Sequence, residues 1–216
     1  REVRDTFLRI AEKYHLGLAE ACGHGELGVR DKLAYLGIYA RPEHYELSGN
    51  CVIETREGTV NLSAIYPYGI ALPSTAVDSI TRLHLNGVHQ IVFIENKTNY
   101  DEYLISEMKP DTLAVYHGGF LSPQKRKLFA KIKDAIPAGM LTLFWADIDL
   151  GGFQMFAHLQ EIIPDIRPMR MSGEEVAAHR QNGLERPKEY LDYLKQALSE
   201  GRYPIFEDAI QEILNY

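Results

Sequence analysis

The order of apolar and polar positions changes near residue 80. Beyond that point, apolar runs recur and each stops at a polar or glycine residue, as three strong runs and a weaker fourth at residues 91–96, 112–120, 141–149 and 166–171. Helical spacing separates these runs, most clearly between Gly152 and Ile163. Strands that are apolar throughout and alternate with helices are typical of a parallel sheet covered on both faces. The pattern therefore predicts an α/β fold with a mostly parallel four-stranded sheet flanked by helices.

The first eighty residues show shorter and less regular patterns. Residues 5–21 place apolar side chains at helical spacing, residues 51–65 indicate a β-hairpin, and residues 75–85 indicate a further helix. We therefore expect an N-terminal helical and β-hairpin extension over residues 1–80, followed by a separate α/β domain over residues 81–216.

Polar side chains stand where three of the predicted strands end. Glu95 closes the first run, the stretch 117–119 closes the second, and Asp147 and Asp149 close the third. The carboxyl ends of parallel strands meet at one edge of a sheet, which is where ligands bind. Carboxylate oxygens suit Mg²⁺ or Mn²⁺, with water and substrate phosphate completing the coordination. The sequence therefore predicts a divalent metal site formed by Glu95, Asp147 and Asp149.

Residues beside these carboxylates are candidates to support the site. A glycine pair lets the backbone approach a phosphate closely, and side-chain amides next to a ligand can orient it. The supporting candidates are Asn96, Asn99, His117, Gly118 and Gly119.

Each candidate also has a structural alternative. Asp147 and Asp149 could cap the helix that follows them, because carboxylates bind the free N–H groups of a helix start. Glu95 could be a solvated loop residue, and the two asparagines could simply turn the chain. A lone histidine such as His117 is more often structural than functional.

Several stretches together resemble a known family. They are IVFIENKTNY (91–100), YHGGF (116–120) and FWADIDLGGFQMF (144–156). In combination they are similar to the C-terminal domain of JetD, the nuclease subunit of the Wadjet plasmid-defence system, a family related to the A subunit of type IIB topoisomerases. A glutamate after one strand and Asp-x-Asp after a later strand is the Toprim pattern. The resemblance covers about residues 80–171 well and the N-terminal eighty residues only loosely.

The resemblance implies a Toprim-like (Rossmannoid) fold, with residues 81–216 as the catalytic domain. Many Toprim proteins have glycine where Asn96 follows the glutamate, and glycine is also expected where Ala146 stands. Neither departure removes a metal ligand.

The activity implied is that of a Mg²⁺-dependent DNA endonuclease subunit in anti-plasmid defence. Asp147 and Asp149 would hold the metal, while Glu95 would complete the metal site or act as a general acid or base. Topoisomerase relatives use a tyrosine from a separate domain, and plain hydrolysis is the simpler interpretation here. The implied partners are DNA and other subunits of a condensin-like defence complex, and they could include a second copy of this chain.

A basic helix expected after Ser122 is the candidate DNA-binding surface. Its Lys125, Arg126 and Lys127 are candidate phosphate contacts, and Arg170 on the fourth strand is another. A solvated helix face is the alternative explanation for such a run of cations.

Composition and charge narrow the class of protein. The formal net charge of −7 argues against a uniformly basic nucleic-acid binder, but it permits a local basic surface beside a metal. No apolar stretch approaches the roughly 20 residues that span a bilayer. The chain has two cysteines, Cys22 and Cys51, and no CxxC motif, which indicates reduced thiols in a cytoplasmic protein. Because the first residue is Arg1 rather than methionine, we also expect an upstream domain to be missing.

Two other functions remain open. One is a metal-dependent phosphohydrolase or phosphotransferase of another α/β type, in which the first aspartate of Asp-x-Asp is phosphorylated. Gly151 stands where that class usually has threonine or a similar small polar residue, which weakens the idea. The other is a non-catalytic scaffold that keeps the fold and binds DNA or a partner.

Overall fold

The computed structural model describes residues 2–15, 17–18, 28–38, 41–183 and 185–215. The chain divides into two compact units, Arg1–Pro42 and Glu43–Tyr216. The first contains the helices α1 (Glu2–Tyr14) and α3 (Val29–Tyr35), joined by an ion pair of 2.7 Å between Lys32 Nζ and Glu12 Oε1. The sequence places a boundary near residue 80, whereas the division between the compact units falls after Pro42.

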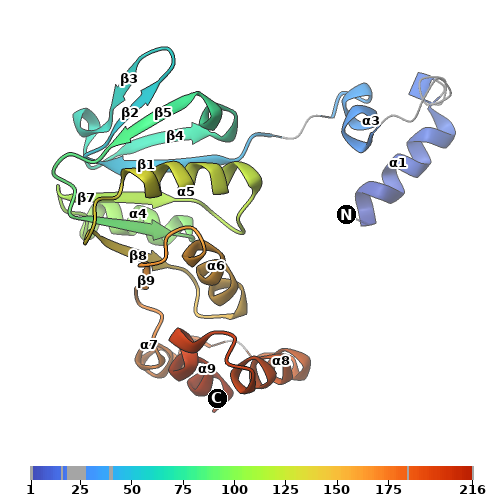
Figure 1. Ribbon diagram of the computed structural model, residues 1–216. Coiled ribbons are helices and arrows are strands. Elements are labelled where there is room, and N and C mark those ends of the chain that lie inside the picture. Colours follow the sequence, from blue (N-terminus) through green and yellow to red (C-terminus); the bar gives the residue numbers. More distant parts are fainter. Residues whose placement is uncertain (1, 16, 19–27, 39–40, 184, 216) are drawn as a thin grey trace. The chain divides into compact units, whose positions relative to one another are not determined.

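The second unit is built on a six-stranded sheet with the order β4-β1-β7-β6-β8-β9 (Figure 1). The strands are β1 (His44–Gly49), β4 (Gly69–Pro73), β6 (Gln90–Ile94), β7 (Thr112–Tyr116), β8 (Leu141–Trp145) and β9 (Arg167–Pro168). The last four run parallel and correspond to the four predicted strands. The mixed α/β fold with a mostly parallel sheet is therefore confirmed.

The predicted strand number of four is wrong, because β1 and β4 extend the sheet beyond β7 as an antiparallel pair. Their sequences, HYELSG and GIALP, are short and lack the continuous apolar run that marks a strand buried on both faces. Antiparallel strands near the edge of a sheet give a weaker signal for this reason.

A second, three-stranded sheet has the order β3-β2-β5. Its β2 (Val52–Thr55) and β3 (Thr59–Asn61) form the predicted hairpin. The helix predicted over 75–85 is wrong, since that segment forms a short 3₁₀ turn (Ser74–Ser79) and then β5 (Ile80–His84). The register shifts by one residue between Glu54 and Thr55, so that Ile80 and Leu83 are both buried. A bulge of this kind brings residues three apart onto one face and imitates helical spacing.

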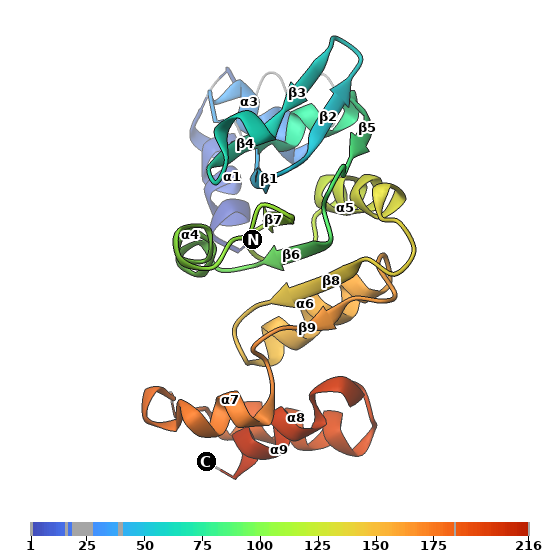
Figure 2. The same ribbon diagram turned by 90° about the vertical axis from the view of Figure 1, so that its left-hand side faces the viewer.

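Helices cover both faces of the larger sheet. On one face, α5 (Pro123–Ala135) and α6 (Leu150–Gln160) pack on a core that includes Phe93 and Phe144. On the other face, α4 (Lys97–Ser106) packs on Val92 and Ile94, and Figure 2 shows α4 and α5 on opposite sides of β6. Alternate residues of β6 thus face different cores, which explains its uninterrupted apolar sequence.

The chain after β9 is mainly helical. It forms α7 (Gly173–Ala178), α8 (Lys188–Ser199) and α9 (Glu207–Leu214). Phe206, just before α9, stacks on Phe153 of α6 at a ring-centroid distance of 4.6 Å, which joins these helices to the main core. In the described part of the chain, no helix is long and apolar enough to cross a membrane.

Cys51 lies in the core, where burial raises the pKa of its thiol to about 12. Such a thiol stays protonated and unreactive at neutral pH. The other cysteine, Cys22, lies outside the described residues.

Candidate functional site

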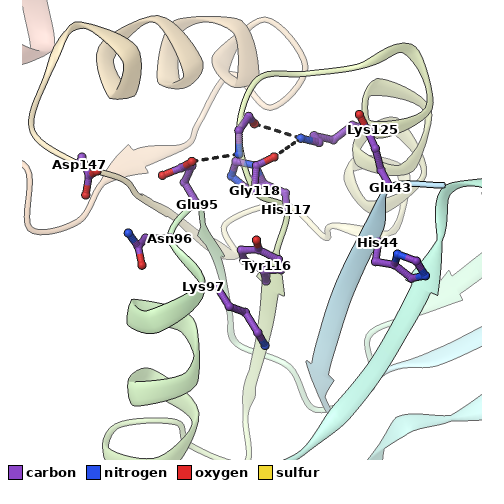
Figure 3. Close-up of a pocket in the computed structure, with 11 residues that line it drawn as sticks. Glu43, His44, Glu95, Asn96, Lys97, Tyr116, His117, Gly118, Lys125 and Asp147 are labelled. Atoms are coloured by element: carbon purple, nitrogen blue, oxygen red, sulfur yellow. Dashed lines mark hydrogen bonds between the residues drawn. The ribbon is translucent and has the colours of Figure 1, made fainter. Parts of the chain in front are cut away.

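The parallel strands end at a point where their order in the sheet reverses. From β6 the chain crosses to β7 on one side, and it later returns to β8 on the other side of β6. Ligands of open α/β sheets bind outside the carboxyl ends of the strands at such a switch point. A hollow of about 490 Å³ lies there and is lined by Glu95, Asn96, Asp147 and the loop 117–119, among others (Figure 3).

Glu95 is the first residue after β6 and is held firmly. Its N–H donates to the Trp145 carbonyl at 2.9 Å, so the backbone is still paired with β8 at this point. Its Oε1 accepts a hydrogen bond of 3.0 Å from the Gly119 N–H (Figure 3). The other carboxylate oxygen has no partner among the described residues, so it is available to a ligand in the hollow.

The glycine loop has its carbonyl groups turned toward a buried lysine. Gly118 and Gly119 have φ angles of +50° and +57°, a left-handed conformation that glycine adopts easily. The Lys125 ammonium donates to the carbonyl of Gly118, to that of Gly119 at 3.0 Å and to that of Phe120 at 2.8 Å. With its carbonyls fixed in this way, the loop directs the Gly119 N–H at Glu95.

Lys125 is therefore not the exposed cation that the sequence suggested. Lys125 is only 2% exposed. Burial lowers the pKa of its ammonium group, while the negative charges of Glu43 and Glu95 act to raise that pKa. The lysine lies in the first turn of α5, which begins at Ser122 with a hydrogen bond of 3.3 Å from the Lys125 N–H to the Ser122 hydroxyl. Because side chains of a helix lean toward its N-terminus, this position brings the ammonium to the loop.

Asp147 is exposed and lies two residues after β8. Its carboxylate has no hydrogen bond or ion pair with any described residue, and it lines the same hollow as Glu95. The structure thus brings two of the three predicted carboxylates to one site.

Asp149 has the role of a helix cap. Its Oδ1 accepts a hydrogen bond of 3.0 Å from the Gly152 N–H at the start of α6, and its Oδ2 lies 3.7 Å from Arg186 Nη2. It does not line the hollow. Among the described residues, no group of three or more His, Cys, Asp or Glu side chains is arranged to hold a metal. Two carboxylates still fit Mg²⁺, which keeps several waters and often takes only one or two carboxylates from the protein.

Asn96 likewise caps a helix. Its side-chain oxygen accepts from the N–H groups of Thr98 at 2.9 Å and Asn99 at 3.4 Å, which starts α4 directly behind Glu95. Asn99 is half-buried in the first turn of α4, and its side chain makes no hydrogen bond with the described residues. For Asn96 the structure therefore shows the structural alternative, because its side chain caps the helix where the chain turns.

Comparison with known families assigns the chain to one of them. A family model described as Wadjet protein JetD, C-terminal, matches residues 53–216. The chain belongs to this family. The resemblance inferred from the motifs is thereby confirmed, and it extends beyond them in both directions. A search of the curated proteins gave no match.

His117 of this JetD-family chain lies in the core beneath the glycine loop. Its ring is 2% exposed, stacks on Phe144 at 5.8 Å and meets Phe129 edge-on at 5.4 Å. Burial, aided by the charge of Lys125, lowers its pKa to about 3. Neither ring nitrogen reaches full hydrogen-bond geometry with a described residue. The Gly119 backbone is still near enough to oppose the lowering of the pKa, so the neutral ring mainly fills space under the loop.

The remaining predicted DNA contacts lie away from the hollow. Arg126 pairs with Glu161 at 3.5 Å, and Lys127 pairs with Asp78 at 2.9 Å on the exposed side of α5. Arg170 follows β9 and is the only one of the three that lies near a predicted metal ligand, because it lines a second hollow together with Asp147.

Sequence reasoning missed several residues that also line the hollow. Lys97 lines the hollow with its Nζ 2.8 Å from both Glu46 and Asp101. Glu43 lines it too, and burial would raise its pKa, but hydrogen bonds from Ser122 and Tyr45 hold the pKa below its usual value. Lys97 could have been noticed because it follows Glu95 closely. No sequence pattern around Glu43 indicated a site residue. It directly precedes β1 and reaches the hollow only because β1 pairs with β7 in the antiparallel part of the sheet.

Proposed function

We propose that this JetD-family chain is a subunit of a Mg²⁺-dependent DNA endonuclease of the Toprim type that acts in anti-plasmid defence. One observation carries the proposal: Glu95 and Asp147, from the ends of two adjacent parallel strands, line a single hollow and have oxygen atoms free of protein partners. The two carboxylates face one hollow at a strand edge and neither forms an ion pair with a described residue, which is an arrangement that a divalent cation can compensate.

Each residue around the hollow would have a separate role in binding the metal. Asp147 and the free oxygen of Glu95 would hold the ion, and Gly119 orients Glu95 through its N–H. When bound there, Mg²⁺ would neutralise charge on the scissile phosphate and the leaving oxygen. Asp149 steadies the loop between β8 and α6, because its N–H donates to the Asp147 carbonyl at 2.9 Å while its side chain caps α6.

Membership of the JetD family supports DNA as the substrate and the other subunits of a condensin-like Wadjet complex as partners. A net charge of −7 gives the isolated chain little general attraction for DNA. We propose that much of the DNA affinity comes from those partners, or from a second copy of the chain.

Two matched substitutions test the metal site. Asparagine caps helices as well as aspartate does, so Asp149→Asn removes the charge and keeps the cap, and Asp147→Asn removes a free carboxylate. Mn²⁺ binding measured by calorimetry should fall at least tenfold in Asp147→Asn. If Asp149 acts only as a cap, Asp149→Asn should bind Mn²⁺ like the wild type. Equal losses in both variants would make Asp149 a third ligand. Cleavage of supercoiled plasmid with Mg²⁺ should rank the wild type and the two variants in the same order as their Mn²⁺ affinities.

A non-catalytic scaffold is the second candidate. It is favoured by Asp149, which caps a helix instead of joining the other two carboxylates. A folded wild-type chain that binds DNA but binds no Mn²⁺, with or without DNA present, would support the scaffold and contradict the nuclease.

A further inference from the structure

A second hollow lies beside Asp147. It has a volume of about 480 Å³, and its lining includes Trp145, Asp147, Arg170 and His179. Asp147 lines both hollows. Because β9 is parallel to β8 and next to it, the residues after β9 reach the same edge of the sheet as Asp147. Along that edge, the strand order therefore gives the glycine loop, Glu95, Asp147 and Arg170 in succession.

Arg170 has a backbone conformation that arginine does not favour. Its φ is +57°, and it is the only residue other than glycine with a positive φ in the described part of the chain. The Met169 N–H still donates to the Phe144 carbonyl at 2.8 Å, so the chain stays beside β8 until this turn. Asparagine or glycine would adopt the conformation more easily. Strain of this kind is found most often at sites where the side chain has a function.

The guanidinium group of Arg170 is held between Trp145 and Glu107 but keeps free donors. It lies over the Trp145 ring at 4.7 Å from the centroid, and its Nη2 donates to Glu107 at 2.7 Å. The side chains of Arg170 and Glu107 are 39% and 34% exposed, and partly solvated ion pairs add little to stability. Nε and Nη1 have no partner among the described residues. A planar fork with free N–H groups is well suited to phosphate oxygens.

We propose that Arg170 binds the backbone phosphate of the nucleotide next to the scissile one. The proposal rests on the proposed function, with Glu95 and Asp147 acting on the scissile phosphate in the first hollow. The DNA strand would then pass over Asp147, which both hollows share. Glu107 keeps the guanidinium in place before DNA arrives and competes with the phosphate for it.

Two substitutions separate this role from a structural one. Arg170→Asn removes the cation and leaves a residue that tolerates the left-handed backbone. Glu107→Gln removes the competing charge and leaves Arg170 intact. Binding of a short fluorescent DNA duplex to the full chain is followed by anisotropy over a range of salt concentrations, with Ca²⁺ supplied in place of Mg²⁺. Mn²⁺ binding and urea unfolding are measured for the same proteins.

Arg170→Asn should weaken DNA binding by roughly tenfold and reduce the salt slope by about one. It should unfold at the same or a higher urea concentration than the wild type and bind Mn²⁺ equally well. Glu107→Gln should bind DNA as tightly as the wild type or several-fold more tightly. Should Arg170→Asn fail to fold, Arg170→Gly replaces it, since glycine fits the same φ.

The contrary outcomes are equally specific. Unchanged DNA binding in Arg170→Asn, or equal weakening in both variants, would overturn the assignment and leave Arg170 as a structural partner of Glu107. Loss of Mn²⁺ binding in Arg170→Asn would overturn it as well, because the residue would then act on the metal site. A folded wild-type chain that binds no Mn²⁺, with or without DNA present, would instead overturn the proposed function together with this inference.

Discussion

Replacing Lys125 by methionine should destabilise the protein and disturb Glu95. Methionine has nearly the length of the lysine stem but offers no N–H, so the carbonyl groups of Gly118, Gly119 and Phe120 would all lose their shared donor. The loop would then no longer direct the Gly119 N–H at the Glu95 carboxylate.

The magnitude follows from two opposing terms. Hydrogen bonds to a charged group contribute about 1.5–3 kcal/mol each. Burial of the ammonium costs several kcal/mol, because it loses its hydration. Water can reach the half-buried loop after the substitution and satisfy part of what is lost. We therefore expect the free energy of unfolding to fall by about 2–4 kcal/mol.

Lys127→Met is the matched control for this experiment. Lys127 lies on the same helix, but its Nζ makes only an exposed ion pair of 2.9 Å with Asp78, so its loss should change the free energy of unfolding by less than about 0.5 kcal/mol. Urea unfolding can be followed by fluorescence, because Trp145 is the single tryptophan, and Mn²⁺ affinity is measured on the folded variants. If both variants have the stability and Mn²⁺ affinity of the wild type, Lys125 does not hold the loop and the reasoning is refuted.

Two further predictions concern the surroundings of the hollow. The pKa of His117 is lowered from 6.5 to about 3, so the unfolded chain takes up the proton first, and stability should fall by as much as about 4 kcal/mol as the pH drops from 6.5 to 3. His117→Phe should remove most of that loss and change the stability at pH 7 by less than about 1 kcal/mol, since neither ring nitrogen reaches full hydrogen-bond geometry and only the Gly119 backbone is near the ring; a strong destabilisation at pH 7 would mean that the imidazole binds something in the hollow. Gly152→Ala would place a Cβ 2.1 Å from the Asp147 carbonyl oxygen, so calorimetry should show weaker Mn²⁺ binding and unfolding should show a loss of about 2–3 kcal/mol. Gly151→Ala, where the nearest atom is a side-chain oxygen at 3.2 Å, should be tolerated, and equal effects of the two would contradict this account.

The parallel part of the fold could be predicted because its strands are buried on both faces. Such strands have uninterrupted apolar sequences, and the ends of these runs indicated Glu95 and Asp147 as candidate site residues. The sequence of β1 has no such run, and its position between β4 and β7 depends on pairing with strands that are distant in the sequence. The helix predicted at 75–85 failed because a bulge produced a spacing that helices also produce.

Side-chain roles within the site were harder to predict than its location. Asp147 and Asp149 are equivalent in sequence as the two acids of one Asp-x-Asp motif, and only the start of α6 separates them into a free carboxylate and a cap. Lys125 looked like its neighbours in a basic run. The contact that distinguishes it is made with a loop whose conformation depends on two successive left-handed glycines.

The way in which cations are engaged around the hollow explains why its carboxylates stay available. Glu95 is close enough to Lys125 to oppose the lowering of the lysine pKa, yet the N–H donors of Lys125 are bound to backbone carbonyls. Lys97 is held between Glu46 and Asp101, and Arg170 is held by Glu107. If any of these side chains had paired with Glu95 or Asp147, the ion pair would have cancelled the charge of that carboxylate and weakened its attraction for a divalent ion. Because none of these cations pairs directly with Glu95 or Asp147, both carboxylates stay available to a metal, and a metal followed by a phosphate is the combination that they favour.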